Sequence, residues 1–190
     1  GSSSTDFIST DNSFRLTLSG NEAGSSSIYV VSTDNGATWT STNATLNSSP
    51  DATYQYKSIV TDAAGNSATS NILTVVVDTL APSAPTLALG AGVSNGATSS
   101  EATQAGGVVT VTGESGASIN VTFTRGANTV TKTLTGTGSS QGVVLTSGDL
   151  TTLGDGLISV SATQTDAAGN AQTVTASTTS FTLDTLAPTT

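Results

Sequence analysis

Two short acidic motifs occur twice in this 190-residue sequence, and their oxygen-bearing side chains could bind a cation. TDAAGN stands at residues 61–66 and again at 165–170, and DTLAP stands at 78–82 and at 184–188. TDAAGN combines a carboxylate, an asparagine amide and a glycine whose positive φ can turn backbone carbonyl groups toward one point. Calcium takes roughly six to eight such oxygens in irregular geometry, whereas magnesium prefers a stricter octahedron with more water. The motifs therefore predict a divalent-cation site, with calcium as the ion.

A bound cation would also explain why carboxylates gather at one place. Two carboxylates ~4 Å apart repel each other by about 4 kcal/mol at an effective dielectric constant near 20, and a cation reverses the sign of that energy. The alternative is that Asp-x-x-Gly-Asn is only a hairpin turn whose Asp side chain caps its own backbone. The repetition of TDAAGN together with DTLAP favours metal binding over turn chemistry alone.

The repeated motifs belong to a longer internal repeat. The two TDAAGN copies are 104 residues apart (165 − 61), which is the usual size of a single domain. SGNEAGSSSI at 19–28 also matches TGESGASI at 112–119, so that Glu22 aligns with Glu114. The sequence therefore predicts two domains, 1–80 and 81–190. Gly1 aligns near Ser94, which predicts that the first domain lacks the strand corresponding to 85–89.

Apolar residues alternate with polar ones along both halves, as in half-buried strands. Phe14, Leu16 and Leu18 share one parity, and β-branched residues are frequent throughout. Asn35-Gly36 is typical of a hairpin turn, and turn signals recur at short intervals. The predicted fold class is all-β, with two tandem β-sandwiches joined by a short linker that Pro82 and Pro85 stiffen. The stretch with Leu150 and Leu153 allows one helical turn at most.

The strand order predicts where the acidic loops lie. With roughly seven strands per domain, TDAAGN and the Glu22 or Glu114 loop fall at the pole where the chain enters. DTLAP leads from one domain into the next, so Asp78 is expected beside Glu114 and Asp166, with calcium at the joint. Glu22 and Glu114 could also be solvated loop carboxylates. Further candidate ligands near the opposite poles, for which surface turns are the alternative, are Asp6, Asp51, Glu101 and Asp155.

Composition excludes several other kinds of site. Charged residues make up 9% of the chain against about 25% in an ordinary soluble domain, and 13 acidic residues face four basic ones, for a net charge of −9. Such a chain repels nucleic acid and anionic lipid. It contains no cysteine and no histidine, which excludes zinc sites of that kind. No apolar run approaches the roughly 18 residues of a membrane span, and no signal peptide is visible.

The chain resembles the tandem bacterial immunoglobulin-like repeats of giant RTX-type, calcium-dependent adhesins exported by type I secretion. The resemblance is carried by STDNGATW, TDAAGN and VDTLAP in the first half, and by EATQAGGVVTVTGESGASINVTF, LGDG, TDAAGN and FTLDTLAP in the second. It implies immunoglobulin-like Greek-key sandwiches that form an extender region. Two features depart from an exact repeat: Tyr54, at the position of a tyrosine corner, is answered by Ile158, and Trp39 has no counterpart.

The resemblance implies a function as well as a fold. Family calcium ligands map to Asp78 and Asp166 at the internal joint, and to Asp62 and Asp184 as half-sites for neighbouring repeats. The implied protein is extracellular, on the bacterial cell surface, and acts in cell adhesion and biofilm formation. Its partners are neighbouring repeats of the same chain, without nucleic acid or direct membrane insertion, and other domains bind the host-cell or surface ligand.

Two other functions are weighed against this spacer. One is a carbohydrate- or protein-binding module with an aromatic platform of Trp39, Tyr54 and Tyr56, although core packing is the simpler role for these residues. The other is an enzyme. Without histidine or cysteine, a serine nucleophile would need a lysine base, and both Lys57 and Lys132 fall in predicted strands. Catalysis is therefore not expected.

Overall fold

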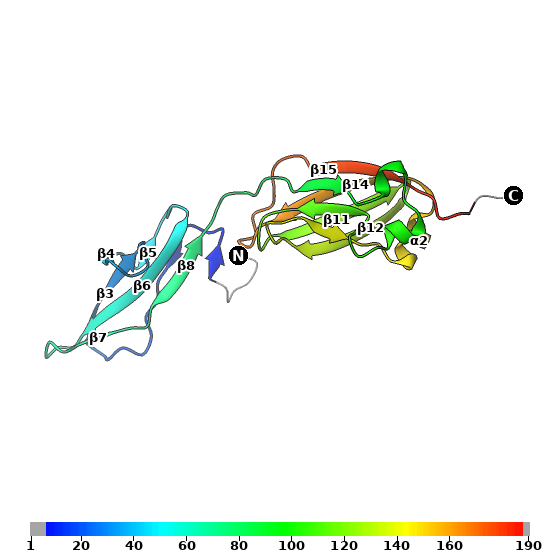
Figure 1. The fold of residues 1–190 in the computed structure, drawn as a ribbon. Coiled ribbons are helices and arrows are strands. Elements are labelled where there is room, and N and C mark those ends of the chain that lie inside the picture. The colour runs from blue at the N-terminus through cyan, green and yellow to red at the C-terminus, as the bar shows by residue number, and fades with distance from the viewer. Residues whose placement is uncertain (1–6, 188–190) are drawn as a thin grey trace. The chain divides into compact units, whose positions relative to one another are not determined.

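The computed structural model of the protein describes residues 7–187 and consists mainly of β-strands (Figure 1). It divides into two compact units, Gly1–Leu80 with Ala168–Asn170 (unit 1), and Ala81–Ala167 with Ala171–Thr190 (unit 2). The predicted domain boundaries, 1–80 and 81–190, stay a prediction. Among residues 7–187, none of the helices could span a membrane.

Unit 1 is built from short strands in two sheets. Its strands are β1 (Ile8–Ser9), β2 (Phe14–Arg15), β3 (Ser26–Ser32), β4 (Thr40–Thr42), β5 (Thr45–Leu46), β6 (Ala52–Thr61), β7 (Ser67–Thr69) and β8 (Leu73–Val77). The larger sheet has the order β1-β8-β6-β3-β4, with β7 also paired to β6, and β2 pairs with β5 in the second sheet. β1 and β8 run parallel, with Ile8 opposite Val76, whereas the other pairs are antiparallel.

The core of unit 1 is small and partly aromatic. Leu16, Tyr56, Val75 and Val77 are buried, and Tyr54 is among the half-buried residues packed against them. The rings of Tyr54 and Tyr56 stack with centroids 5.9 Å apart, and burial raises the pKa of Tyr56 to about 12, with a smaller contribution from Tyr54. The Tyr54 hydroxyl donates a hydrogen bond to the Pro50 carbonyl (2.8 Å), which is the geometry of a tyrosine corner.

Unit 2 is a β-sandwich with three short helical segments. Its strands are β9 (Thr86–Leu89), β10 (Val109–Thr112), β11 (Ser118–Arg125), β12 (Asn128–Thr135), β13 (Gln141–Val143), β14 (Gly156–Thr165) and β15 (Ser177–Leu183). Its helical segments are η1 (Val93–Asn95), α1 (Ser99–Ala102) and α2 (Ser147–Leu153). One sheet has the order β13-β10-β9 and the other β12-β11-β14-β15. One buried cluster takes side chains from both sheets, which confirms the predicted all-β sandwich fold.

The core of unit 2 is formed by side chains at every second position along its strands. Along β11, Ile119, Val121 and Phe123 are fully buried, and along β14 the buried set is Ile158, Val160 and Ala162. Burying apolar surface contributes about 25 cal/mol per Å², so these two central strands provide much of the unit's stability.

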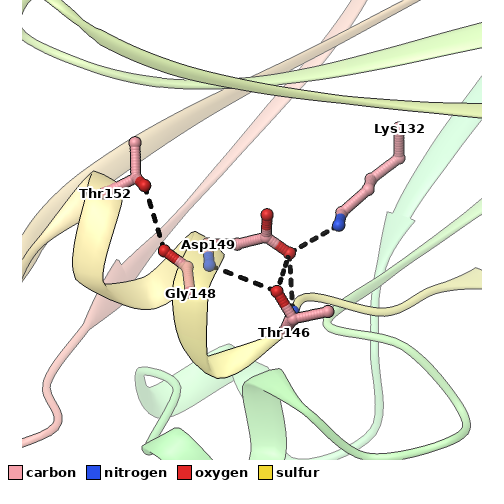
Figure 2. Close-up of polar contacts among 5 residues, drawn as sticks. All are labelled: Lys132, Thr146, Gly148, Asp149 and Thr152. Atoms are coloured by element: carbon pink, nitrogen blue, oxygen red, sulfur yellow. Dashed lines mark hydrogen bonds and ion pairs between the residues drawn. The ribbon is translucent and has the colours of Figure 1, made fainter.

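Helix α2 is longer than the single turn predicted at Leu150 and Leu153. Thr146 caps it: its hydroxyl accepts the Asp149 N–H (3.2 Å), while the Asp149 carboxylate accepts the Thr146 N–H (2.6 Å). Lys132 of β12 donates to the same carboxylate oxygen (2.5 Å; Figure 2). Leu150 and Leu153 point into the core. The reciprocal cap and the two buried leucines explain the extra turn.

Candidate calcium-binding loops

The TDAAGN loop of unit 1 connects β6 to β7. The Asp62 carboxylate accepts hydrogen bonds from the backbone N–H groups of Ala64 (2.9 Å) and Asn66 (2.8 Å) and from the Asn66 side-chain amide (2.8 Å). Gly65 closes the turn with a φ of 94°. These bonds, the Asn66 side chain first, lower the pKa of Asp62. The turn chemistry considered as an alternative is therefore present, and it fixes the carboxylate in place.

The Glu22 loop, between β2 and β3, lies beside the TDAAGN loop of unit 1. A cavity of about 410 Å³ is lined by residues of both loops, including Asn21, Glu22, Asp62 and Asn66. Glu22 is exposed, and its backbone carbonyl accepts a hydrogen bond from the Ser25 N–H (3.2 Å). The fold thus brings two carboxylates and two amides of unit 1 to one cavity.

In the second TDAAGN loop, Asp166 is 5% exposed, and Gly169 has a φ of 100° that matches Gly65. Asn170, which clusters with unit 1, donates from Nδ2 to the backbone carbonyl of Asp78 (2.9 Å). One residue of the TDAAGN motif therefore contacts the first residue of the DTLAP motif.

The Glu114 loop of unit 2 is fixed by a residue that the sequence reasoning missed. Gln164 is 3% exposed and accepts the Glu114 N–H at Oε1 (3.0 Å), while its Nε2 donates to the Ser83 carbonyl (2.7 Å). A Cβ added at Gly113 would lie 2.4 Å from the Gln164 oxygen, so a larger residue there would have to displace this side chain. The Glu114 side chain itself is exposed. Gln164 could have been found, because it continues the inward parity of Ile158, Val160 and Ala162.

The DTLAP segments have the same geometry in both units. Asp78 accepts the Leu80 N–H, and Asp184 accepts the Leu186 N–H, each at 3.1 Å. The following threonine donates through its N–H and its hydroxyl to an upstream aspartate, Thr79 to Asp51 (3.0 and 2.9 Å) and Thr185 to Asp155 (3.0 and 2.8 Å). We refer to the pairs Asp51–Thr79 and Asp155–Thr185 as the Asp–Thr clasps.

Not all of the proposed ligands are brought together. Among residues 7–187, no three acidic side chains form a group that could hold a metal ion. Asp6 lies outside the described residues. Glu101 accepts hydrogen bonds from Thr98 at the start of α1, and Asp51 and Asp155 form the clasps. The convergence of Asp78, Glu114 and Asp166 on one ion stays a prediction.

The three aromatic residues considered for a sugar-binding platform differ in exposure, since Trp39 and Tyr54 are half-buried and Tyr56 is buried. Tyr56 is 2% exposed. The Lys57 ammonium lies 3.8 Å from the centroid of the Trp39 ring, and the Trp39 indole N–H donates to the Gly36 carbonyl (3.0 Å). Trp39 therefore packs against its own loop and against Lys57 of β6, and it is not part of the buried cluster, which corrects the core role expected for it.

The chain contains two Gly-x-Ser-x-Gly stretches, at 92–96 and 138–142, a motif that the sequence reasoning wrongly held to be absent. Both serines, Ser94 and Ser140, are exposed, and the chain contains no histidine to activate either one. Both lysines are engaged elsewhere, Lys57 over Trp39 and Lys132 with Asp149. The described residues thus offer these serines no histidine or unengaged lysine as a base.

Comparisons with known proteins report similar repeats. A tetra-tandem repeat from the extending region of a large adhesion protein is 21% identical, with a TM-score of 0.44, and covers 90% of this chain and 44% of its own. The Ca²⁺-stabilised adhesin that helps an Antarctic bacterium reach out and bind ice is 25% identical (TM-score 0.31; 90% and 43% covered). The fibronectin(III)-like modules of Clostridium thermocellum CbhA are 14% identical (TM-score 0.35; 94% and 87% covered).

The chain spans less than half the length of the first two of these structures. Comparison with curated proteins found no match. Residues 1–79 match the model of the bacterial Ig-like domain. The resemblance to bacterial immunoglobulin-like repeats is therefore confirmed over that part of the chain.

Proposed function

We propose that this chain is a non-catalytic spacer of a bacterial surface adhesin, in which calcium stiffens the joints between immunoglobulin-like repeats. The spacer projects a distal domain, which binds the ligand, away from the cell. It therefore works outside the cell, and its direct partners are neighbouring repeats of the same chain.

The Asp–Thr clasps carry this proposal. Both units end in the same DTLAP geometry, with an aspartate turn and a threonine held by an upstream aspartate at nearly equal distances. A segment built identically at the end of successive repeats suits a modular array, because each repeat presents the same end to the one that follows.

The linker between the units is also held within each unit. Unit 1 fixes Thr79 through Asp51. Unit 2 fixes Ser83 through Gln164, and the Pro85 carbonyl through the Ser177 hydroxyl. Pro82 and Pro85 fix φ at two further positions. Few backbone dihedrals remain unrestrained between Leu80 and Ser83, and a short, stiff connection is what a spacer requires.

The donor atoms present suit calcium. The cavity shared by Glu22 and Asp62 offers carboxylate and amide oxygens, which are hard ligands. Asp62 uses three of about four acceptor positions on its own loop, so the turn and a metal contact are compatible. At the joint, Asp78, Glu114 and Asp166 would hold the ion, and Asp184 would serve the following repeat. Bound calcium would supply a fixed positive charge that draws these carboxylates together.

Thermal unfolding with and without calcium tests the proposal. Added Ca²⁺ should raise the melting temperature, and a chelator should reverse the effect. When calcium reaches one hundred times its dissociation constant, the free energy of unfolding should rise by about 2.7 kcal/mol. Asp166→Asn should reduce this response, whereas the control Asp11→Asn, outside both motifs, should keep it.

Small-angle scattering of the same protein tests the mechanical part. Calcium should narrow the distribution of maximum dimensions, because it removes motion at the joint. If neither the melting temperature nor the scattering profile changes on addition of calcium or of chelator, the proposal that calcium stiffens the joint is wrong.

A further inference from the structure

The second sheet of unit 1 has an open edge. β2 pairs with β5, and the Leu16 N–H continues that pairing by donating to the Ala44 carbonyl (2.7 Å). On the opposite side of residues 16–19, no strand within residues 7–80 is paired. Next to this edge lies a cavity of about 400 Å³, lined by Leu16, Leu18, Tyr56, Leu73 and Val75 among others.

Unit 2 shows what fills the corresponding place. There β10, which matches residues 16–19 in the repeat, pairs with β13 on one side and with β9 on the other. β9 also contacts β15 and β14, and its Leu87 and Leu89 pack against the core. In unit 2, the neighbours of β9 are thus β10, β15 and β14. Their counterparts in unit 1 are residues 16–19, β8 and β6, and all three of these segments line the cavity. Its position in unit 1 is therefore that of β9 in unit 2.

We infer that this cavity is a strand-accepting groove, and that its occupant is an extended segment with the β9 pattern, supplied from outside residues 7–80. The occupant would pair antiparallel with residues 16–19 and add a third strand to the β2–β5 sheet. Backbone hydrogen bonds would provide affinity, and pockets for alternate side chains would provide specificity.

The groove specifies the chemistry of this segment. Its walls of leucine, valine and tyrosine suit two apolar side chains two positions apart, as Leu87 and Leu89 are in β9. Asn71 lines the cavity, and its counterpart in unit 2 is Ser177, because each lies seven residues before the aspartate of DTLAP. In unit 2, the Ser177 hydroxyl donates to the Pro85 carbonyl. The Asn71 amide can donate in the same way to a proline carbonyl of the incoming segment. A proline two residues before the first leucine is thus part of the predicted pattern.

A peptide with the sequence of residues 83–91, SAPTLALGA, tests the inference on the whole 190-residue protein. Trp39 and all three tyrosines belong to unit 1, so tryptophan fluorescence follows the unfolding of that unit selectively. Peptide at ten times its dissociation constant should raise the folded-to-unfolded ratio of unit 1 about elevenfold. The transition of unit 2, followed by backbone circular dichroism, should not move.

Two controls make the result decisive. A peptide with serine in place of both leucines should have no effect. Leu18→Lys places a charge in the groove but leaves the buried cluster of Leu16, Tyr56, Val75 and Val77 intact, so this variant should fold and lose the response to the peptide. Equal responses to both peptides would overturn the inference. Dimerisation of the protein that the peptide leaves unchanged would also overturn it, because a second copy would then cover the edge.

Discussion

Asp34 organises a whole loop in a chain that has few charges. Its carboxylate accepts hydrogen bonds from the Thr38 hydroxyl (2.5 Å), the Thr38 N–H (2.9 Å) and the Ser32 hydroxyl (2.7 Å). These bonds, the one from the Thr38 side chain first, lower the pKa of Asp34 from 3.8 to about 2. Asn35 and Gly36 both take positive φ at the tip of this loop, as the Asn-Gly pair predicted.

Replacing Asp34 with asparagine should make unit 1 less stable at neutral pH. The folded-state pKa lies below the unfolded value, so the stability from this carboxylate is present above pH 3.8 and is lost as the pH falls toward 2. The difference in urea midpoint between the wild type and Asp34→Asn, followed by Trp39 fluorescence, should therefore shrink as the pH falls from 5 to 2. A difference that is constant over this range would show that charge plays no part.

Tyr54→Phe removes only the hydroxyl that bonds to Pro50. A typical intramolecular hydrogen bond contributes about 1 kcal/mol net, and the free energy of unfolding of unit 1 should fall by about that amount. Denaturation followed by Trp39 fluorescence measures it. Tyr29→Phe is the matched control, since no hydrogen bond of the Tyr29 hydroxyl is present among residues 7–187 and its removal should have little effect. Equal losses in the two variants would contradict the role given to the tyrosine corner.

Residue-level features could be predicted where the signal is local. The TDAAGN turns, the Asn35-Gly36 turn and the tyrosine corner each depend on residues within five positions of one another. The clasps could not be predicted in this way, because Asp51 and Thr79 are 28 positions apart and Asp155 and Thr185 are 30 apart. Only the pairing of β6 with β8, and of β14 with β15, brings these side chains together.

At the scale of elements, α2 depends on one carboxylate with two roles. Burial alone would raise the pKa of Asp149, but the hydrogen bonds from Lys132 and Thr146, together with the Lys132 charge, lower it below its usual value. Lys132→Met should cost less than about 1 kcal/mol, because it removes only a partly exposed ion pair.

Asp149→Ala should cost more than Lys132→Met, since it removes the same ion pair and also a cap that contributes about 1 kcal/mol. Thermal unfolding of unit 2 at pH 7, followed by backbone circular dichroism, compares the two variants. As the pH falls below 3.8 and through the lowered pKa of Asp149, protonation should weaken both interactions, so the wild type should approach the alanine variant. Equal losses in the two variants would mean that the ion pair, and not the cap, holds α2.

The strands were largely predictable and the helices were not. Alternation marks β6 and β14 because each has one face against a core. α2 was predicted as one turn at most because its seven residues are too few to show a helical period, and the Thr146–Asp149 cap that precedes the leucines was not read as a start signal.

At the scale of the molecule, the two units differ in how much apolar surface they bury. The core of unit 2 takes side chains from β10, β11, β13, β14 and β15, whereas the buried cluster described in unit 1 is Leu16, Tyr56, Val75 and Val77. We expect two unfolding transitions, with unit 1 first, because hydrophobic stabilisation scales with buried area. In a urea titration, Trp39 fluorescence, which reports on unit 1, should change at a lower urea concentration than the circular dichroism signal from the strands of unit 2. A single coincident transition would show that the units unfold together.

The parallel pairing of β1 with β8 has a consequence when the chain is pulled. β1 is near the start of unit 1 and β8 near its end, and Ser9 and Phe7 accept hydrogen bonds from Asp78 and Val76. Because the two strands run in the same direction, tension applied to opposite ends of the unit slides one strand along the other, and these bonds bear the force together instead of opening one by one. Ala97 makes the same parallel link to Leu183 in unit 2. In unit 1 the described chain is thus fastened along β1 and β8, so that a stretching load shears this pair of strands.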